Sequence, residues 1–197
     1  MVLMKRLGVG VNDAQYCTSY VGTDGKKVTC QVYRRWSMMF QRCYCTKFHM
    51  LYPTYAGCSV SPCWHTFTAF REWLQQQNWV GRQLDKDLLT SRNKVYSPER
   101  CMLVPEAINS LMNDSARSRG NFPIGVTLHE RGRFHARVRV RGVQTYLGSF
   151  DTPEAASTAY KVAKIGHIES LLPSLTDEDP RLIPALRRIV FDLRSKL

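Results

Sequence analysis

Residues 133–141 alternate strictly between apolar and polar side chains, and this pattern is the strongest constraint that the sequence places on its fold. A period of two is typical of a β-strand, whose successive side chains point to opposite faces. One face of this strand would be apolar and the other almost wholly cationic. The apolar set is Phe134, Ala136, Val138 and Val140, and the polar set is Arg133, His135, Arg137, Arg139 and Arg141.

Turn signals on both sides of this strand extend it into a sheet. Gly132 marks the preceding turn, and residues 141–144 (Arg-Gly-Val-Gln) mark the following one. The next strand then runs from Thr145 to Phe150. The sequence therefore predicts a three-stranded antiparallel sheet that begins near Gly125.

The cationic face of this sheet indicates what the protein binds. Arginines gathered on one face repel one another, so gathering them does not stabilise the fold. The whole chain of 197 residues carries a formal net charge of +12, and a polyanion is the natural partner of such a surface. The simpler alternative, a solvated outer face, would be expected to mix acids with bases. We therefore expect double-stranded DNA to lie against the sheet, which can enter a groove as a helix does.

A helix should follow the sheet. Thr152, Pro153 and Glu154 supply a cap, a proline suited to the first helical position and an acid favoured by the helix dipole. The alanines after them would allow close packing on the sheet. After the acidic turn at residues 176–180, apolar residues at helical spacing predict a closing helix that serves packing or a dimer contact.

Residues 122–163, FPIGVTLHERGRFHARVRVRGVQTYLGSFDTPEAASTAYKVA, resemble an AP2-type DNA-binding domain. The similarity covers residues 122 to about 168. In such domains the sheet lies in the major groove, which implies DNA contacts by Arg133, Arg137, Arg139 and Tyr146, with Arg141 on the same cationic face. Tyr146 replaces a common tryptophan. Arg137 stands where plant members often carry an acid, so their base preference does not transfer.

The first half of the chain shows helical rather than alternating patterns. Val32, Trp36, Met39 and Cys43 recur at helical spacing, and residues 47–62 read as a loop punctuated by proline and glycine. A second helix is predicted by an apolar stripe that is typical of a core face, consisting of Trp64, Phe67, Phe70, Trp73 and Leu74.

Residues 84–109, LDKDLLTSRNKVYSPERCMLVPEAIN, follow this helix and end the first half. They predict a strand, a loop, a returning strand through Tyr96, Cys101 and Val104, and a helix introduced by Pro105. An acid at the start and an amide in the helix could hold one divalent cation. An ordinary hairpin packed on a helix, with acids on its surface, explains the same pattern.

Residues 33–109 resemble HNH-type endonucleases of phages and mobile introns. The similarity rests on spaced aromatic residues from Tyr33 to Phe70, on the segment LDKD at residues 84–87 and on NKVYSPERC at residues 93–101. It implies a ββα-metal fold in which Asp85 and Asn109 bind Mg²⁺ or another divalent cation. Carboxylate and amide oxygens suit that ion.

Two positions depart from the HNH pattern. Lys86 stands where the general-base histidine is expected, and a charged lysine accepts a proton from water only if its pKa falls far. Arg100 replaces the central asparagine and could brace the loop or hold a phosphate. Asp87 and Tyr96 are the nearest candidates for the missing base.

The predicted organisation is an α+β chain of two domains. Residues 1–113 would form the HNH-like domain, 114–121 a linker, 122–170 the AP2-like domain and 171–197 a helical extension. No apolar stretch approaches the roughly 18 residues that span a bilayer, so no membrane partner is expected. The seven cysteines lack paired CxxC spacing, which favours free thiols over a zinc site.

An HNH-like half joined to an AP2-like half resembles phage homing endonucleases. This resemblance implies metal-dependent hydrolysis of DNA, by nicking or double-strand cutting, in the cytoplasm of an infected host cell. Two other classes fit the same residues. One is a DNA-binding protein whose nuclease half has decayed and which acts by occupancy, and the other is an inhibitor of a host nucleic-acid enzyme.

Overall fold

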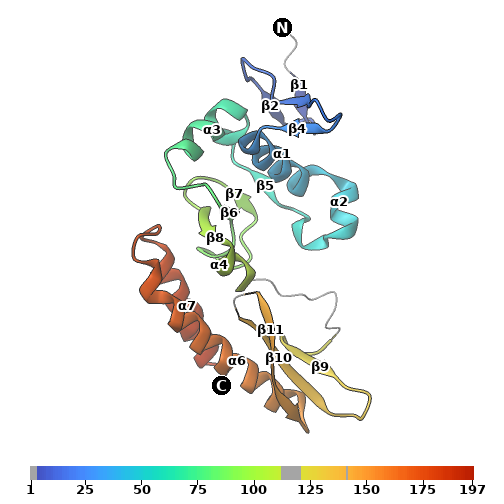
Figure 1. Ribbon diagram of the computed structural model, residues 1–197, viewed down its shortest axis with the longest axis vertical. Helices are drawn as coiled ribbons and strands as arrows, with labels where there is room; N and C mark the ends of the chain where they lie inside the picture. The colour runs from blue at the N-terminus through green and yellow to red at the C-terminus, as the bar shows by residue number, and fades with distance from the viewer. Residues whose placement is uncertain (1–3, 112–120, 141) are drawn as a thin grey trace. The chain divides into compact units, whose positions relative to one another are not determined.

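The computed structural model of the chain describes residues 4–111, 121–140 and 142–197 (Figure 1). Helices and strands are mixed throughout, as expected for an α+β protein. The chain divides into two compact units, Met1–Leu103 (unit 1) and Val104–Leu197 (unit 2). This division falls ten residues before the domain end expected at residue 113. Residues 112–120, which include most of the predicted linker, lie outside the described part of the chain.

Unit 1 begins with two short antiparallel hairpins. The first joins β1 (Met4–Arg6) to β2 (Gly10–Asn12), and the second joins β3 (Ser19–Val21) to β4 (Lys27–Thr29). Gly10 leaves no room for a side chain, since a Cβ there would lie 2.9 Å from the rings of Trp36 and Phe40. The first hairpin is therefore pressed onto the aromatic core.

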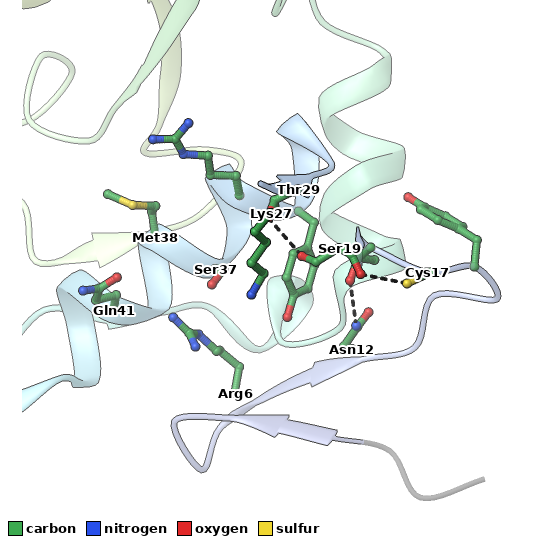
Figure 2. A pocket seen from close by; sticks show the side chains of 13 residues that line it. Arg6, Asn12, Cys17, Ser19, Lys27, Thr29, Ser37, Met38 and Gln41 are labelled. Carbon is green, nitrogen blue, oxygen red and sulfur yellow. Dashed lines mark hydrogen bonds between the residues drawn. The ribbon is translucent and has the colours of Figure 1, made fainter. Parts of the chain in front are cut away.

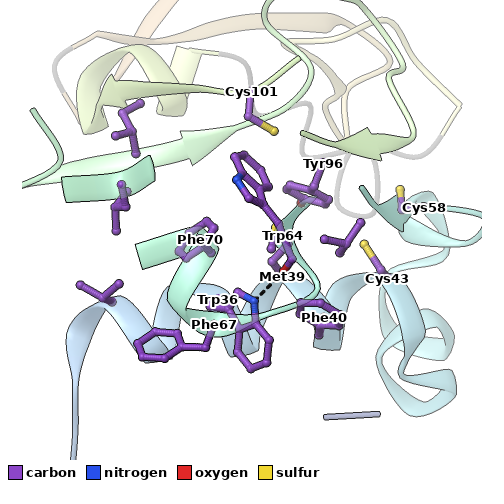
Figure 3. Close-up of a cluster of buried hydrophobic side chains, with 14 residues drawn as sticks. Trp36, Met39, Phe40, Cys43, Cys58, Trp64, Phe67, Phe70, Tyr96 and Cys101 are labelled. Atoms are coloured by element: carbon purple, nitrogen blue, oxygen red, sulfur yellow. Dashed lines mark hydrogen bonds between the residues drawn. The ribbon is translucent and has the colours of Figure 1, made fainter. Parts of the chain in front are cut away.

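Helices α1 (Gln31–Tyr44) and α3 (Phe67–Gln75) supply most of that core, as the aromatic spacing predicted. The indole Nε1–H of Trp36 donates to the carbonyl oxygen of Trp64, at 2.9 Å (Figure 3). Trp64 itself lies in the short 3₁₀ helix η2 (Pro62–Trp64), so α3 begins three residues after the predicted stripe does. Both indoles are almost fully buried.

The segment predicted as a loop contains regular structure. Helix α2 (Thr46–Leu51) and the 3₁₀ helix η1 (Pro53–Tyr55) precede strand β5 (Ser59–Val60). Strand β5 pairs in parallel with β7 (Val95–Tyr96). The loop prediction was wrong for α2 because a helix of six residues is too short to show a periodic stripe; none of its residues is buried.

The strand–loop–strand–helix order predicted for residues 84–109 is present. Strand β6 (Arg82–Asp85) forms a two-stranded sheet with β8 (Met102–Pro105), and α4 (Glu106–Leu111) follows directly. The returning strand differs from the prediction because Tyr96 leaves it and joins β5 instead. The division between the two units falls inside β8, so α4 belongs to unit 2.

Unit 2 contains the predicted three-stranded antiparallel sheet, in the order β11–β10–β9. Its strands are β9 (Val126–Leu128), β10 (Phe134–Val140) and β11 (Val143–Phe150). Helix α6 (Pro153–Leu171) packs on one face of the sheet (Figure 1), where Val126, Ala136 and Ala156 form the centre of a small core.

Helix α6 begins where the capping signal predicted, since the Thr152 hydroxyl accepts the backbone N–H of Ala155 at 3.1 Å. The 3₁₀ helix η3 (Leu172–Leu175) links it to α7 (Leu182–Arg194), which packs along α6. Lys164 of α6 is buried and donates to the Leu111 carbonyl at 2.8 Å and to the Tyr160 hydroxyl at 3.1 Å. Among the described helices, none is both long and apolar enough to cross a membrane.

Candidate nucleic-acid interface and nuclease centre

The outer face of β10, opposite α6, carries two exposed arginines of unit 2. Ala136 and Val138 are buried, whereas Arg137 and Arg139 between them are exposed. The alternation in the sequence therefore separates the strand into a face that packs on the helix and a cationic face in solvent. Within the described residues, the side chain of neither arginine forms an ion pair or a hydrogen bond, so both guanidinium groups are available to a partner.

Strand β11 places an aromatic ring beside these arginines. Arg137 pairs across the strands with Tyr146, and cross-strand partners project from the same face. The register skips one residue between Ala136 and Arg137, so Leu147 has no partner on β10 and packs against the core instead. This bulge keeps Tyr146 on the outer face, where 53% of it is exposed.

Two histidines extend the outer face toward β9. The rings of His129 and His135 are stacked with their centroids 4.4 Å apart, and His135 meets the Tyr146 ring edge-on at 5.2 Å. Loss of water around the His135 ring, together with the nearby charges of His129, Arg137 and Arg133, lowers its pKa. The face is therefore a row of rings flanked by guanidinium groups.

Arg133 lies at the edge of this face and is already engaged. Its Nε and Nη2 atoms donate to the hydroxyl and the carbonyl oxygen of Ser149, each at 2.9 Å, and its Nη1 lies 2.8 Å from a carboxylate oxygen of Asp151. Arg133 thus fastens β10 to the end of β11. Arg141, the remaining predicted DNA contact, lies outside the described residues.

In unit 1, the predicted metal ligand Asp85 ends strand β6 and is half-buried. Its Oδ1 accepts the backbone N–H groups of Asp87 at 2.8 Å and Leu88 at 2.7 Å, which fix the orientation of the carboxylate. Burial raises the pKa of Asp85, and the two backbone donors oppose that shift. Within the described residues, Oδ2 has no recorded hydrogen bond, so this oxygen remains available to a ligand.

Lys86, in the position of the expected base, points into the protein and is only 7% exposed. Its ammonium group donates to both carboxylate oxygens of Asp87, at 2.7 and 2.8 Å, and to the Asn93 carbonyl at 2.7 Å. It also lies about 6 Å from the ring centroids of Tyr55 and Tyr96. Every donor of this lysine is therefore directed at the loop or at the core, and Asp87 is held by it.

Tyr96 is 1% exposed and its hydroxyl is hydrogen-bonded to the Arg42 side chain. Burial raises the pKa of Tyr96, while the Arg42 charge opposes that shift. A base must be deprotonated to act, so the direction of this shift disfavours the role considered for Tyr96 in the sequence. The residue instead packs in the core beside Cys101 (Figure 3).

The other two candidates, Arg100 and Asn109, belong to different units. Arg100 is exposed in the turn before β8, and Asn109 is half-buried on α4 of unit 2. In two histidines of unit 1, His49 and His65, the Nε2 atom is hydrogen-bonded to the carbonyl oxygens of Arg42 and Val60, at 2.8 and 2.9 Å. Both histidines thereby serve the local fold.

The sequence alone does not indicate that Asn93 positions this loop. The buried Asn93 amide donates to the carbonyl oxygens of Lys86 at 2.9 Å and Val95 at 2.7 Å, and its side-chain oxygen accepts the Val95 N–H at 3.1 Å. An asparagine in a polar loop reads as a turn residue, and nothing local to the sequence signals its burial.

All seven cysteines are free thiols; Cys43, Cys58 and Cys101 are buried, and the others are partly or fully exposed. In the described part of the chain, no group of three or more histidine, cysteine, aspartate or glutamate side chains is arranged to hold a metal ion. The chain matches no protein-family model, no curated protein and no solved structure.

Proposed function

We propose that this protein binds double-stranded DNA through the outer face of its β11–β10–β9 sheet and cuts it with unit 1 as a metal-dependent endonuclease. The observation that carries the proposal is the pair of exposed arginines, Arg137 and Arg139, which form no ion pair among the described residues and lie beside the exposed Tyr146 ring. Cations kept in solvent without an acidic partner gain most from contact with phosphates, because binding releases condensed counterions from the DNA.

The geometry of the sheet supports contact with a groove. A β-sheet can enter the major groove of B-DNA, where arginine pairs bidentately with guanine. The described sheet is covered by α6 on one side only, so its outer face is open. A three-stranded sheet packed on one helix is also the arrangement of AP2-type domains, which the sequence of residues 122–163 resembles, and we assign residues 122–170 to that type.

The nuclease half of the proposal depends on Asp85 and on the resemblance of residues 33–109 to HNH endonucleases. The donor set fits a hard divalent cation, because a carboxylate oxygen fixed by two backbone N–H groups leaves the second oxygen for the metal. Asp85 would hold the ion, and the resemblance to HNH endonucleases, rather than the geometry, implies Asn109 as a second ligand. The ion would neutralise the charge that develops on the scissile phosphate.

A second function is favoured by Lys86. The position that needs a base holds a buried ammonium group bound to Asp87 and to the loop backbone. Neither Lys86 nor Asp87 is therefore in a position to accept a proton from water. If no other group does so, unit 1 is a folded remnant of a nuclease, and the protein acts by occupying DNA or by inhibiting a host nucleic-acid enzyme.

Incubation with supercoiled plasmid, with Mg²⁺ and with EDTA, separates the two functions. The endonuclease converts the plasmid to nicked or linear product only with the metal, and Asp85→Ala and Asn109→Ala each abolish the conversion. The control is Asp24→Ala, which removes an exposed acid of unit 1 that pairs with Lys26. That variant should cut as the wild type does.

A mobility-shift titration of the same plasmid fixes the concentration at which DNA is saturated. Uncut plasmid at that concentration rules out the endonuclease and leaves occupancy as the function. Failure of the wild-type protein to shift DNA at all, at low salt, contradicts both.

A further inference from the structure

The first forty residues of the chain, which lie mostly outside both resemblances, form a cationic pocket in unit 1. The pocket has a volume of about 550 Å³ and opens between the two N-terminal hairpins and α1. This volume lies in the range of ligand sites, roughly 300–1,000 Å³. The proposed DNA surface is in unit 2, so the pocket is a separate feature of the molecule.

Three cations and no acid line this pocket. They are Arg6 at the end of β1, Lys27 at the start of β4 and Arg34 in the first turn of α1. In the described part of the chain, none of the three has a recorded ion pair. Like charges brought together without a counter-charge raise the free energy of the folded protein, and a bound anion lowers it.

Arg6, which lines the pocket, carries a hydrogen-bond donor without a partner among the described residues. Its Nε is buried and has no hydrogen-bond partner within the described residues. A buried donor without a partner is costly to the fold, so its presence indicates a group that is supplied from outside. Figure 2 shows the Arg6 and Lys27 side chains reaching into the same space beside Ser37 of α1.

The scaffold holds these groups in place. Arg6 pairs with Gly10 across the first hairpin, and Gly10 is pressed onto the rings of Trp36 and Phe40. Lys27 pairs with Val21 in the second hairpin. Arg6 therefore projects from a short strand whose hairpin is packed on the core, which keeps the cost of ordering that strand on binding small.

The remaining lining identifies the class of anion. Tyr16 and Tyr33 both line the pocket, and both pack edge-on against the buried Phe67 ring, with centroid distances of 6.4 and 5.3 Å. Two anchored aromatic rings next to cations and hydroxyl groups suit a ligand with a planar base and a phosphate. Guanidinium and ammonium groups are the usual phosphate donors.

We propose that this pocket binds the phosphate of a nucleotide, with Arg6 and Lys27 on the phosphate and the tyrosine wall beside the base. The nucleotide could be free or could be the terminal residue of a nucleic-acid strand. The proposal does not depend on whether the protein cuts DNA.

Calorimetric titration of the full chain tests the proposal with three small probes: deoxyadenosine monophosphate, deoxyadenosine and inorganic phosphate. We expect the monophosphate to bind tightest. Arg6→Gln and Lys27→Gln should each weaken it about tenfold, as expected for the loss of one charge-assisted hydrogen bond. Lys26→Gln is the matched control, because it removes the neighbouring exposed charge, which does not line the pocket, and should change affinity less than twofold.

A fourth probe distinguishes the two sources of the nucleotide. It is an eight-residue single strand, with and without a 5′-phosphate, added to a protein that also carries Arg137→Ala and Arg139→Ala to suppress binding by the sheet. If binding of the strand depends on both Arg6 and the 5′-phosphate, the result supports a strand end as the ligand. If only binding of the monophosphate depends on Arg6, the result supports a free nucleotide.

Two results overturn the proposal. One is equal affinity of wild type, Arg6→Gln and Lys27→Gln for the monophosphate and the phosphorylated strand. The other is inorganic phosphate binding as tightly as the monophosphate, which would assign the site to a simple anion. If Arg6→Gln lowers the thermal midpoint of unfolding, Lys27→Gln, at an exposed hairpin position, gives the deciding measurement.

Discussion

Cations serve opposite purposes in the loop of unit 1 and on the sheet of unit 2. Lys86 is buried and donates hydrogen bonds to the Asp87 carboxylate and the Asn93 carbonyl. Arg137 and Arg139 are exposed and have no recorded partner among the described residues. The first arrangement stabilises a loop, and the second leaves charge available for a polyanion.

The difference shows that burial and partners, rather than residue type, separate a structural cation from a binding one. A buried charge is tolerated only when it is paired and hydrogen-bonded. An unpaired charge stays in solvent, where it contributes little to stability but can exchange water and counterions for phosphates. Substitution of the buried Lys86 should therefore change mainly stability, and substitution of the exposed sheet arginines mainly DNA affinity.

Lys86→Met tests the structural side of the comparison. Methionine keeps the apolar stem and removes the charge, so Asp87 and the Asn93 carbonyl lose their shared donor. We expect the free energy of unfolding of unit 1 to fall by about 3 kcal/mol, the lower end for breaking a buried pair, because Asp87 is partly exposed.

Urea unfolding followed by tryptophan fluorescence measures this change in unit 1 alone, since all four tryptophans of the chain lie there. Arg100→Ala, at an exposed position of the same loop region, should change the free energy by less than about 0.5 kcal/mol. Equal effects of the two substitutions would show that Lys86 is not a structural cation.

Local signals explain which parts of the fold could be predicted from the sequence. Helix α1, the start of α6 and strand β10 were predicted because their signals are local: apolar periodicity in the first, a cap and a proline in the second, and alternation in the third. The exposed arginines of β10 follow from the same alternation. Site residues that recur with a regular period along one strand can thus be predicted from the sequence.

Non-local contacts account for what was not predicted. The parallel pairing of β5 with β7 joins Ser59 to Val95, and no local signal specifies it. The burial of Lys86 depends on Asn93 and on the rings of Tyr55 and Tyr96, which meet only after the chain has folded. Four strands of three residues each, as at the N-terminus, are also too short to show a period.

Arg137→Ala combined with Arg139→Ala tests the binding side of the comparison. We expect DNA affinity to fall about a hundredfold at moderate salt, since each arginine contributes about 1–3 kcal/mol if it reaches a base. The slope of log K against log salt should become shallower by about two, because two phosphate-neutralising charges are lost. Fluorescence anisotropy with a labelled duplex, at several salt concentrations, measures both quantities.

Arg187→Ala with Arg188→Ala is the matched control, because it removes the same charge from α7 of unit 2, away from the sheet strands. If this control weakens DNA binding as much as the sheet variant does, net charge rather than the sheet face determines affinity. The thermal stability of the sheet variant should equal that of the wild type within about 0.5 kcal/mol.

His135 sharpens the comparison by adding a cation that depends on pH. Loss of water around the ring and the charges of His129, Arg137 and Arg133 lower its pKa below the ordinary value. The unfolded chain then takes up the proton first, so unit 2 loses stability as pH falls from about 6.5 through the lowered pKa. DNA phosphates favour the charged ring, so affinity should rise severalfold as pH falls from 8 to 6.

His135→Phe keeps an aromatic ring against His129 and Tyr146 but removes the titration. Both pH profiles, of unit 2 stability and of DNA affinity, should become flatter in this variant. Anisotropy titrations at each pH, with wild type and variant in parallel, measure the affinity profile. An unchanged slope in His135→Phe would assign the pH dependence to another group.

Arg133 stands between the two kinds of cation and gives the smallest expected effect. It lies on the sheet, yet its donors already engage Ser149 and Asp151. Moving it to a phosphate would break those contacts, so its net contribution to DNA binding is reduced.

Arg133→Ala should weaken binding less than threefold, compared with about tenfold for Arg137→Ala alone. The converse variant, Asp151→Asn in the wild-type background, removes the acid that pairs with Arg133. It should release the Arg133 guanidinium group from that contact and strengthen DNA binding slightly. The opposite ranking, with Arg133→Ala the more damaging, would mean that partners within the fold do not determine which cations bind DNA.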